Sequence, residues 1–406
     1  MSSTFCVRNY DYYMVELDRL VWRMCCHTTP RTMNSDADWY NGSEMQERRH
    51  AASNNIKHKD CHFCWKLEDS GFLSPRHHSL KTYENSSEFG NKDILEIKLS
   101  NICDLACRYC DAPFSSIWAQ RKGSYIKTDI NGVSTTQQYD KKFMSNFTST
   151  DDYKKVFRQF VDWLNKEMPR FVRGRGLTFT GGEPFLDDNL YELIEQLDIK
   201  DTRIVFNTNI NTPENKWKQQ TDLLQKLIAK NNTVMLRCSI DGIGAQQEWQ
   251  RQGSDWNLMK ENWLRLGSLP LTMGAALTVT PLTLESMCGI GSFVRLTSTK
   301  LNKNPIWFPS SIVNYPKQFC PIEWFSSFKK EIEMMLKLVR SDNIVAGEVV
   351  LNELNSWFNS SNLEPSIEAK NMLISKLDEA EKLYGGGSWR EIYPKVAEIA
   401  TKNPQA

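Results

Sequence analysis

The chain has no histidine beyond residue 78, although it runs to residue 406. Imidazole is the side chain that most often acts as a general base near neutral pH, and it is a common ligand of zinc. Whatever chemistry the central part of the chain performs therefore uses neither a histidine base nor a histidine-ligated metal. All six histidines stand near the N-terminus: His27, His50, His58, His62, His77 and His78.

The sequence also lacks a charge excess and a long apolar run. Lys and Arg number 50 and Asp and Glu number 49, so the net charge of +1 produces no global field that would attract nucleic acid or an anionic membrane. No stretch of about 18 apolar residues is present, and the N-terminus lacks the pattern of a secretion signal. Eleven cysteines in such a chain are typical of thiols or metal ligands in a reducing compartment. We therefore expect a cytoplasmic protein without a membrane segment.

What is present from about residue 89 onward is an alternation of short strand-like runs with helical patterns. Between two such runs, for example, Phe157, Phe160 and Leu164 recur at helical spacing. Alternation of this kind predicts an α/β domain of parallel strands joined by crossover helices, with ligand sites at the carboxyl ends of the strands. We place this domain at residues 89–315. The predicted strands are 94–100, 175–180, 202–207, 233–240, 272–279 and a short one at 306–308.

Three other parts of the chain depart from this alternation. Residues 1–88 are rich in Cys and His with little periodicity, which predicts a separate N-terminal domain. Residues 115–152 are polar and aperiodic, and they form either a lid or substrate-contacting insertion or a disordered loop. Residues 316–406 are helical in pattern and form either a tail that packs over the open side of the α/β domain or a separate binding module. One helical face carries Phe325, Phe328, Ile332, Met335, Leu336 and Val339, and a later one carries Leu373, Leu377 and Leu383 before Gly385-Gly386-Gly387 ends it.

Three cysteines, Cys103, Cys107 and Cys110, form a C-x3-C-x2-C pattern directly after the apolar run Leu95–Leu99. Three thiolates can hold three irons of a [4Fe–4S] cube and leave the fourth iron open to another ligand. Two alternatives are three ordinary buried thiols and a zinc site. Zinc motifs, however, come as paired C-x2-C units, and no partner pair stands nearby. The pattern therefore favours a cluster with an open iron, which is a place for chemistry.

A second motif, Gly181-Gly182-Glu183, follows another predicted strand. Two glycines let the backbone approach a ligand closely, and a carboxylate beside them can accept hydrogen bonds from an ammonium group. Taken alone, such a motif is usually only a turn. Polar side chains also end the two strands that follow: Asn207, Asn209, Ser239 and Asp241. Capping of strand ends is the structural alternative for these polar residues.

Together, the cysteine triplet and the glycine motif about seventy residues later resemble the radical S-adenosylmethionine (SAM) superfamily. The resemblance implies a partial (β/α)6 barrel of parallel strands, with the Cys- and His-rich domain before it and the helical region after it. In that family the cluster loop has an aromatic residue before its last cysteine, and its backbone lies against the adenine of SAM. The second motif grips the methionyl amino group, and strand ends and an arginine meet the ribose and the carboxylate. The matching positions here are Tyr109, Gly181, Gly182, Glu183, Asn207, Asn209, Ser239, Asp241 and Arg251.

The resemblance also implies a reaction. SAM chelates the open iron, and one electron from the reduced cluster cleaves SAM to methionine and a 5′-deoxyadenosyl radical, which abstracts hydrogen from a substrate. This step needs the low end of the cluster potential range, so an external donor such as a flavodoxin or ferredoxin is implied.

The N-terminal cysteines resemble a second cluster domain. Cys61 and Cys64 form a C-x2-C pair followed by Glu68, Gly71, Ser74 and Arg76, which is similar to the SPASM and twitch domains of many radical SAM enzymes, although those usually follow the barrel. The resemblance implies a second [4Fe–4S] cluster. A structural zinc with Cys and His ligands, given His58 and His62 nearby, is the alternative, and so is no metal. The implied ligands are Cys6, one of Cys25 and Cys26, Cys61 and Cys64, whereas Cys238, Cys288 and Cys320 are expected to be packed thiols.

Substrate identity rests on analogy alone. Relatives with auxiliary clusters often modify peptides or proteins, which is the substrate class we expect. Alternatives are a nucleotide or other small molecule, and, outside enzymes, an iron–sulfur electron carrier or a zinc-stabilised binding protein.

Overall fold

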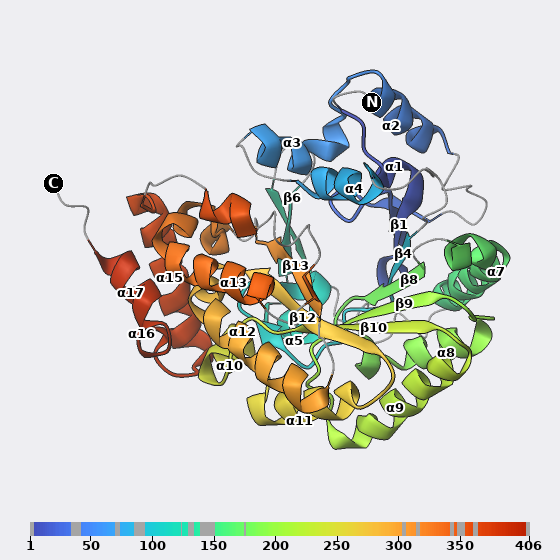
Figure 1. The fold of residues 1–406 in the computed structure, drawn as a ribbon. Coiled ribbons are helices and arrows are strands. Elements are labelled where there is room, and N and C mark those ends of the chain that lie inside the picture. Colours follow the sequence, from blue (N-terminus) through green and yellow to red (C-terminus); the bar gives the residue numbers. More distant parts are fainter. Residues whose placement is uncertain are drawn as a thin grey trace. The chain divides into compact units, whose positions relative to one another are not determined.

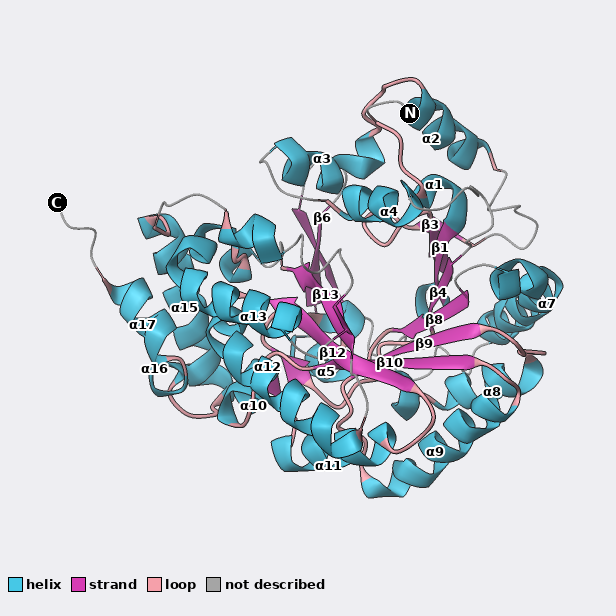
Figure 2. Ribbon diagram, in the orientation of Figure 1, coloured by secondary structure: helices cyan, strands magenta, loops and turns pink. Residues whose placement is uncertain are grey.

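The structure is a computed structural model that describes residues 4–33, 42–69, 74–84, 94–122, 124–128, 134–138, 151–173, 176–302, 306–313, 317–341, 345–346, 354–359 and 364–402 (Figures 1 and 2). The chain forms two compact units. Unit 1 comprises residues 1–103, 111–207 and 218–235, and unit 2 comprises residues 104–110, 208–217 and 236–406.

Unit 1 is built on parallel strands that lie in the order β1, β4, β8, β9. Leu95, Leu177, Phe179, Ile204 and Phe206 on these strands are fully buried, which explains why the runs read as apolar in the sequence. The strands predicted at 94–100, 175–180 and 202–207 are thus confirmed. The bounds are β1 Tyr12–Glu16, β4 Ile94–Lys98, β8 Gly176–Thr180 and β9 Arg203–Thr208, with β2 Val21–Arg23 and β3 Arg31–Thr32 extending antiparallel from β1.

Strand β1 comes from the Cys- and His-rich N-terminal segment. It pairs in parallel with β4 along its whole length, from Tyr12 opposite Ile94 to Glu16 opposite Lys98. The segment therefore shares a sheet with the first strand of the predicted α/β domain. Its helices are α1 Arg8–Asp11, α2 Ser43–Ser53, α3 His62–Asp69 and α4 Pro75–Glu84, with a 3-10 turn η2 at Lys59–Cys61.

The described part of the 115–152 insertion contains regular structure that the sequence did not predict. Helix α5 spans Ser116–Lys122, and β6 Ser124–Thr128 pairs antiparallel with β7 Ser134–Gln138. The strands are rich in Ser, Thr and Gln, so they carry no apolar alternation for a sequence pattern to detect. Residues 123, 129–133 and 139–150 lie outside the described residues. The other helices of unit 1 are α7 Asp151–Arg173, α8 Asp188–Gln196 and most of α9 Glu214–Ala229.

Unit 2 continues the strand–helix alternation. Strands β12, β13 and β14 pair in parallel, and Ile240, just past β10, donates its N–H to the carbonyl of Ala276 on β12 at 3.2 Å. The strands predicted at 233–240, 272–279 and 306–308 are confirmed, the last one longer than expected. The α/β class with parallel strands therefore holds, whereas closure into a partial barrel stays a prediction. The bounds are β10 Thr233–Ser239, β12 Thr272–Val279, β13 Ile306–Ile312 and β14 Val345–Ala346, and the helices are α10 Ala245–Gln250, α11 Trp256–Gly267, α12 Pro281–Leu301, α13 Lys329–Ser341, α15 Ile367–Tyr384, α16 Trp389–Ile392 and α17 Pro394–Thr401.

The C-terminal helices bury the predicted faces with one exception. All six residues of the first predicted face are buried, as are Leu373 and Leu377 on α15. Leu383 is 57% exposed, so its assignment to the buried face was wrong. The reason is that α15 ends one residue later, and Leu383 lies on the outer side of its last turn. Among the residues that the structure describes, no helix has the length and apolar character needed to cross a bilayer.

A buried group of charges stands at the carboxyl ends of β1 and β4. The Lys98 ammonium is fully buried and donates to the Asp18 carboxylate at 2.9 and 3.1 Å. Glu16 lies 3.6 Å from Lys98 and is ion-paired with Arg19 and Arg23. Burial by itself raises the pKa of Glu16, but these cations outweigh it and lower the pKa to about 2.

We predict that Glu16→Gln weakens the dependence of the free energy of unfolding on pH below 4.5. The folded-state pKa of Glu16 lies below its unfolded value of 4.5, so its contribution is present at neutral pH and is lost as pH falls from 4.5 toward about 2. At pH 7 the substitution should cost on the order of 3 kcal/mol in the free energy of unfolding. Chemical denaturation followed by circular dichroism between pH 7 and pH 3 measures the difference. A cost that does not shrink with falling pH would contradict this account.

Candidate functional site

The cluster loop, residues Asp104–Cys110, lies in unit 2. Its strand β5, Ala106–Cys107, pairs antiparallel with β11, Arg251–Gln252, so that Cys107 lies opposite Arg251. The N–H of Cys110 donates to the carbonyl of Cys107 at 2.9 Å, which makes the C-x2-C end of the loop a tight turn. Cys107 is buried and Cys110 is half-buried. Burial raises the pKa of Cys107, whereas the guanidinium of Arg251 opposes that rise.

Three predicted cofactor residues meet beside Cys107. Asp241 is fully buried, and its carboxylate accepts hydrogen bonds from the Tyr109 hydroxyl, from Arg251 Nε at 2.7 Å and from the backbone N–H of Thr278 at 2.6 Å. Arg251 also points Nη1 at Cys107 Sγ, 3.8 Å away. A guanidinium in this position can stabilise a thiolate or another anion.

Asn209 has a role in the protein itself. Its side-chain amide donates to the Asp104 carboxylate at 2.8 Å and its amide oxygen accepts from the N–H of Asn211, whose own side chain donates to the other oxygen of Asp104 at 2.8 Å. Both ends of the amide are therefore used to hold the start of the cluster loop. Of the other predicted strand-end residues, Ser239 is half-buried at the end of β10 in unit 2, and Asn207 is half-buried near the end of β9 in unit 1.

The glycine motif lies in unit 1, where it packs against the backbone that leads into Cys103. Gly182 and Glu183 donate their N–H groups to the carbonyls of Ser100 at 3.2 Å and Ile102 at 2.6 Å. A Cβ on Gly182 would stand 2.0 Å from the Ile102 oxygen, so the position excludes any side chain. The Glu183 carboxylate is buried and accepts from the N–H of Phe185 at 3.3 Å. The two glycines thus let their backbone approach the backbone of residues 100–102 closely.

A residue of the 115–152 insertion, Ser116, binds the backbone of Cys103. Its N–H donates to Ser116 Oγ at 3.2 Å, and the Ser116 hydroxyl donates to its carbonyl at 3.0 Å. Ser116 is the first residue of α5, so this helix fixes the start of the cysteine motif.

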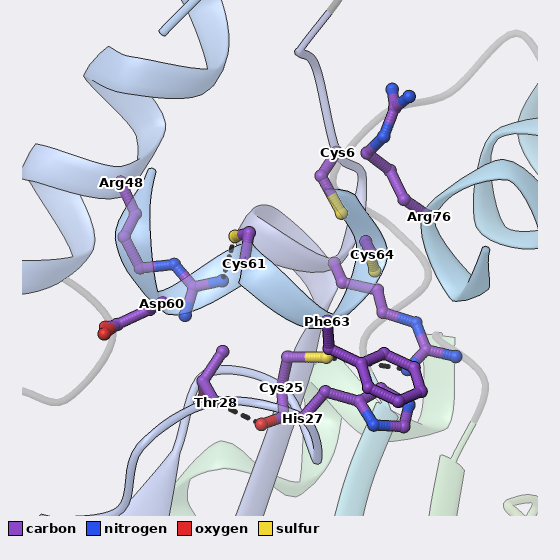
Figure 3. A pocket seen from close by; sticks show the side chains of 11 residues that line it. Cys6, Cys25, His27, Thr28, Arg48, Asp60, Cys61, Phe63, Cys64 and Arg76 are labelled. Atoms are coloured by element: carbon purple, nitrogen blue, oxygen red, sulfur yellow. Dashed lines mark hydrogen bonds between the residues drawn. The ribbon is translucent and has the colours of Figure 1, made fainter. Parts of the chain in front are cut away.

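A cavity in the N-terminal segment has about 360 Å³ of space between its lining atoms, part of which is open to solvent (Figure 3). Four of the five N-terminal cysteines line it: Cys6, Cys25, Cys61 and Cys64. They come from four separate places, before α1, after β2, at the end of η2 and in α3. Cys26 does not line the cavity, and the structure therefore distinguishes two neighbours that the sequence left equivalent.

Arginines surround this cavity, and the sequence analysis missed two of them. Arg8 points Nη1 at Cys25 Sγ, 3.7 Å away, and Arg48 points Nη2 at Cys61 Sγ, 3.4 Å away. Arg48 is 2% exposed, and its Nε and Nη1 are buried without a hydrogen-bond partner. The sequence could have predicted the burial of Arg48, because this residue lies at helical spacing between the apolar residues Met45 and Ala52 of α2.

The residues that follow the C-x2-C pair form a connected network. Glu68 binds Arg76 through both carboxylate oxygens, at 2.9 and 2.6 Å, and accepts from the Ser74 hydroxyl. Arg76 also donates to the carbonyl of Phe5 at 3.0 Å, next to Cys6. The network ties α3, with Cys64, to the segment that carries Cys6. Gly71 lies outside the described residues.

Burial sets the protonation of these thiols. Burial, with the neighbouring Cys25 and Cys61, raises the pKa of Cys6 to about 12, and burial together with Cys25 raises the pKa of Cys64 to about 11. Bare thiols of this kind are protonated at neutral pH, so a metal has to displace their protons. In the described parts of the chain, no three His, Cys, Asp or Glu side chains surround a single metal-ion position. The thiolates of a cube bind separate irons and do not converge on one such position.

Comparison with known proteins finds similarity to solved structures alone. No family model matches the chain, and no curated protein matches it. Two solved structures that resemble it are of anSMEcpe with bound AdoMet, one of the histidine-tagged protein and one of the native protein. Their sequences are 16% and 15% identical to this chain, with TM-scores of 0.39 and 0.38. The similarity covers 62% of this chain in both cases and 60% and 63% of the two structures, so the chain spans less than two thirds of their length.

We predict that Gly182→Ala destabilises unit 1 by about 3 kcal/mol, because its Cβ would overlap the Ile102 carbonyl and push the segment before Cys103 away from β8. Gly289→Ala is the matched control, since the Cβ there would meet only the tip of the Ile243 side chain. Denaturant unfolding compares the two variants, and hydrogen exchange at residues 100–103 locates the change. Equal stability of the two variants would refute the steric argument.

Proposed function

We propose that this chain is a radical SAM enzyme whose loop Cys103–Cys110 holds a [4Fe–4S] cluster with an open iron. The observation that carries the proposal is the meeting of Tyr109, Asp241 and Arg251 beside Cys107 in unit 2. These residues were singled out from the sequence for roles at one cofactor, although more than a hundred residues separate Tyr109 from the other two. A buried cation against a cysteine sulfur fits a thiolate-bound, anionic cluster.

When bound and reduced, a cluster of this type supplies the electron that cleaves SAM to a 5′-deoxyadenosyl radical. In this proposal the chain binds and orients SAM. The Glu183 carboxylate would accept hydrogen bonds from the amino group of SAM, and the guanidinium of Arg251 would face the carboxylate of SAM. Asp241 keeps Arg251 in place through the 2.7 Å bond. The backbone at Tyr109 would lie along the adenine, and the polar strand-end residues Asn207 and Ser239 would be the candidates for the ribose, since both ends of the Asn209 amide already hold the cluster loop.

For the N-terminal cavity we propose a second [4Fe–4S] cluster, held by Cys6, Cys25, Cys61 and Cys64. A cube with four thiolates is an anion, and the two unpartnered nitrogens of Arg48 are donors suited to its sulfurs. Cys25 is the ligand in preference to Cys26 because it lines the cavity. Zinc with His58 and His62 is disfavoured, since neither lines the cavity and the His58 ring accepts from the N–H of Asp60 at 3.2 Å.

The substrate that we propose is a peptide or protein, by analogy with enzymes that carry auxiliary clusters. The electron donor is a flavodoxin or ferredoxin, because reductive cleavage of SAM needs a low potential. We also propose a reducing, cytoplasmic setting, in which the cysteines of the chain stay available as metal ligands.

The reaction is tested with anaerobically reconstituted protein, SAM and dithionite. Wild-type protein should form 5′-deoxyadenosine, and Cys107→Ala should lower the yield to background, because it removes a ligand of the catalytic cluster. Cys288→Ala is the matched control, a half-buried thiol on α12 that belongs to neither cysteine motif, and should keep the yield. No 5′-deoxyadenosine from wild type, or full yield from Cys107→Ala, defeats the proposal.

Iron and sulfide analysis tests the second cluster. We expect about eight irons per wild-type chain and about four in Cys25→Ala. Cys26→Ala should keep about eight, because its thiol does not face the cavity. About four irons with one zinc in wild type would support a structural zinc site instead.

A further inference from the structure

Arg108 stands between Cys107 and Tyr109 and is 3% exposed. Its side chain leads away from the cysteines to two other parts of unit 2. Nε donates to the carbonyl of Trp249 at 3.1 Å, and Nη1 and Nη2 donate to the carbonyls of Ala380 at 3.4 Å and Gly385 at 2.8 Å. The guanidinium also lies over the rings of Trp249 and Tyr384, 4.8 and 5.5 Å from their centres. One side chain thus joins the middle of the cluster loop to the end of α15.

The end of α15 is shaped to receive this side chain. A helix leaves its last carbonyls without partners inside the helix, and a cation there also interacts favourably with the helix dipole. Arg108 binds one such carbonyl, that of Gly385, and adds a bond to the carbonyl of Ala380 near the end of the helix. Gln252 Nε2, from β11, donates to another carbonyl at the helix end, that of Tyr384, at 2.6 Å. Loop and strand β11 therefore cap the helix together.

The three glycines after α15 make this contact possible. Gly385, Gly386 and Gly387 all have positive φ, at 64°, 100° and 86°, a conformation that glycine adopts without strain. A Cβ on Gly386 would stand 3.4 Å from both Arg108 Nη2 and Trp249 Cδ1. Trp249 Nε1 donates to the carbonyl of Gly387 at 3.3 Å, which holds the turn against α10.

We propose that Arg108 is a positioning residue for the loop cluster and that the end of helix α15, with the glycine turn after it, is a structural part of that cluster site. A loop that is already held when metal arrives loses less conformational freedom on binding, so it retains the cluster better. The backbone N–H of Arg108 strengthens the hold by donating to the carbonyl of Gln250 at 2.8 Å. This inference rests on the proposed function, since it requires a cluster at Cys103–Cys110.

The test uses the full chain with Cys61→Ala, so that the remaining iron reports on the loop cluster. In that parent, Arg108→Gln removes the charge and leaves one donor nitrogen in place of three. Arg108→Lys keeps the charge but loses the planar arrangement of the three donor nitrogens. The control is Arg390→Gln, which removes an arginine of the C-terminal region that is paired with Asp378 on α15 at 2.6 and 3.1 Å and does not contact the loop. The readouts are the rate at which excess chelator removes iron and the electron paramagnetic resonance spectrum of the reduced cluster with and without SAM.

Arg108→Gln should lose iron about tenfold faster than the parent or more, with an altered spectrum, and Arg108→Lys should fall between the two. Arg390→Gln should match the parent. Iron loss from Arg108→Gln at the parent's rate overturns the inference, as does an equal acceleration in Arg390→Gln, which would mean general destabilisation. If Arg108→Gln does not fold, Arg108→Lys takes its place. Faster iron loss and faster hydrogen exchange at the amides of Arg108 and Cys110 in Arg108→Lys support the inference, and unchanged rates overturn it. A parent without loop iron defeats the proposed function instead, so the two failures are distinct.

Discussion

The buried ion pair between Asp241 and Arg251 is the contact on which the rest of unit 2 depends. Its two side chains are 0% and 9% exposed and meet at 2.7 Å. A buried pair is stable only when its remaining donors and acceptors are also satisfied, and Asp241 achieves this with Tyr109 and Thr278. The carboxylate thereby joins the cluster loop, β11 and β12. Because losing one partner would leave a charge buried without compensation, these elements hold their places together.

The same physical logic recurs at both cysteine groups. Burial makes a thiolate costly, and a buried guanidinium beside the sulfur offsets part of that cost. Arg251 stands beside Cys107 in unit 2, and Arg48 stands beside Cys61 in unit 1. Each site is therefore prepared for an anion before any metal arrives. In the proposed function, a metal that binds there would displace the remaining protons and add its binding free energy to the stability of the surrounding fold.

Unit 1 shows how the N-terminal cysteines are tied to the sheet. The segment with Cys6 and Arg8 runs directly into β1, which pairs along its length with β4. β4 in turn leads into Ser100 and Ile102, whose carbonyls receive the glycine motif. The ion pairs of Lys98 with Glu16 and Asp18 lock the carboxyl ends of the two strands. Parallel pairing thus makes the cysteine-rich segment part of the same unit as the glycine motif and leaves no flexible linker at β1.

Six of the strands, the helical face from Phe325 to Val339 and the cysteine and glycine motifs could be predicted from the sequence, because burial along a strand or helix and ligand spacing within a loop are local properties. The lining of the cavity by Cys25 and not by Cys26 could be seen only in the folded chain, since these neighbouring residues have the same spacing and differ only in the direction their side chains take. The same is true of the pairing of Arg108 with Gly385 and of Asp241 with Tyr109, whose members lie more than a hundred residues apart along the chain. Long-range pairs of this kind leave no periodic trace, because each partner reads locally as an ordinary polar residue.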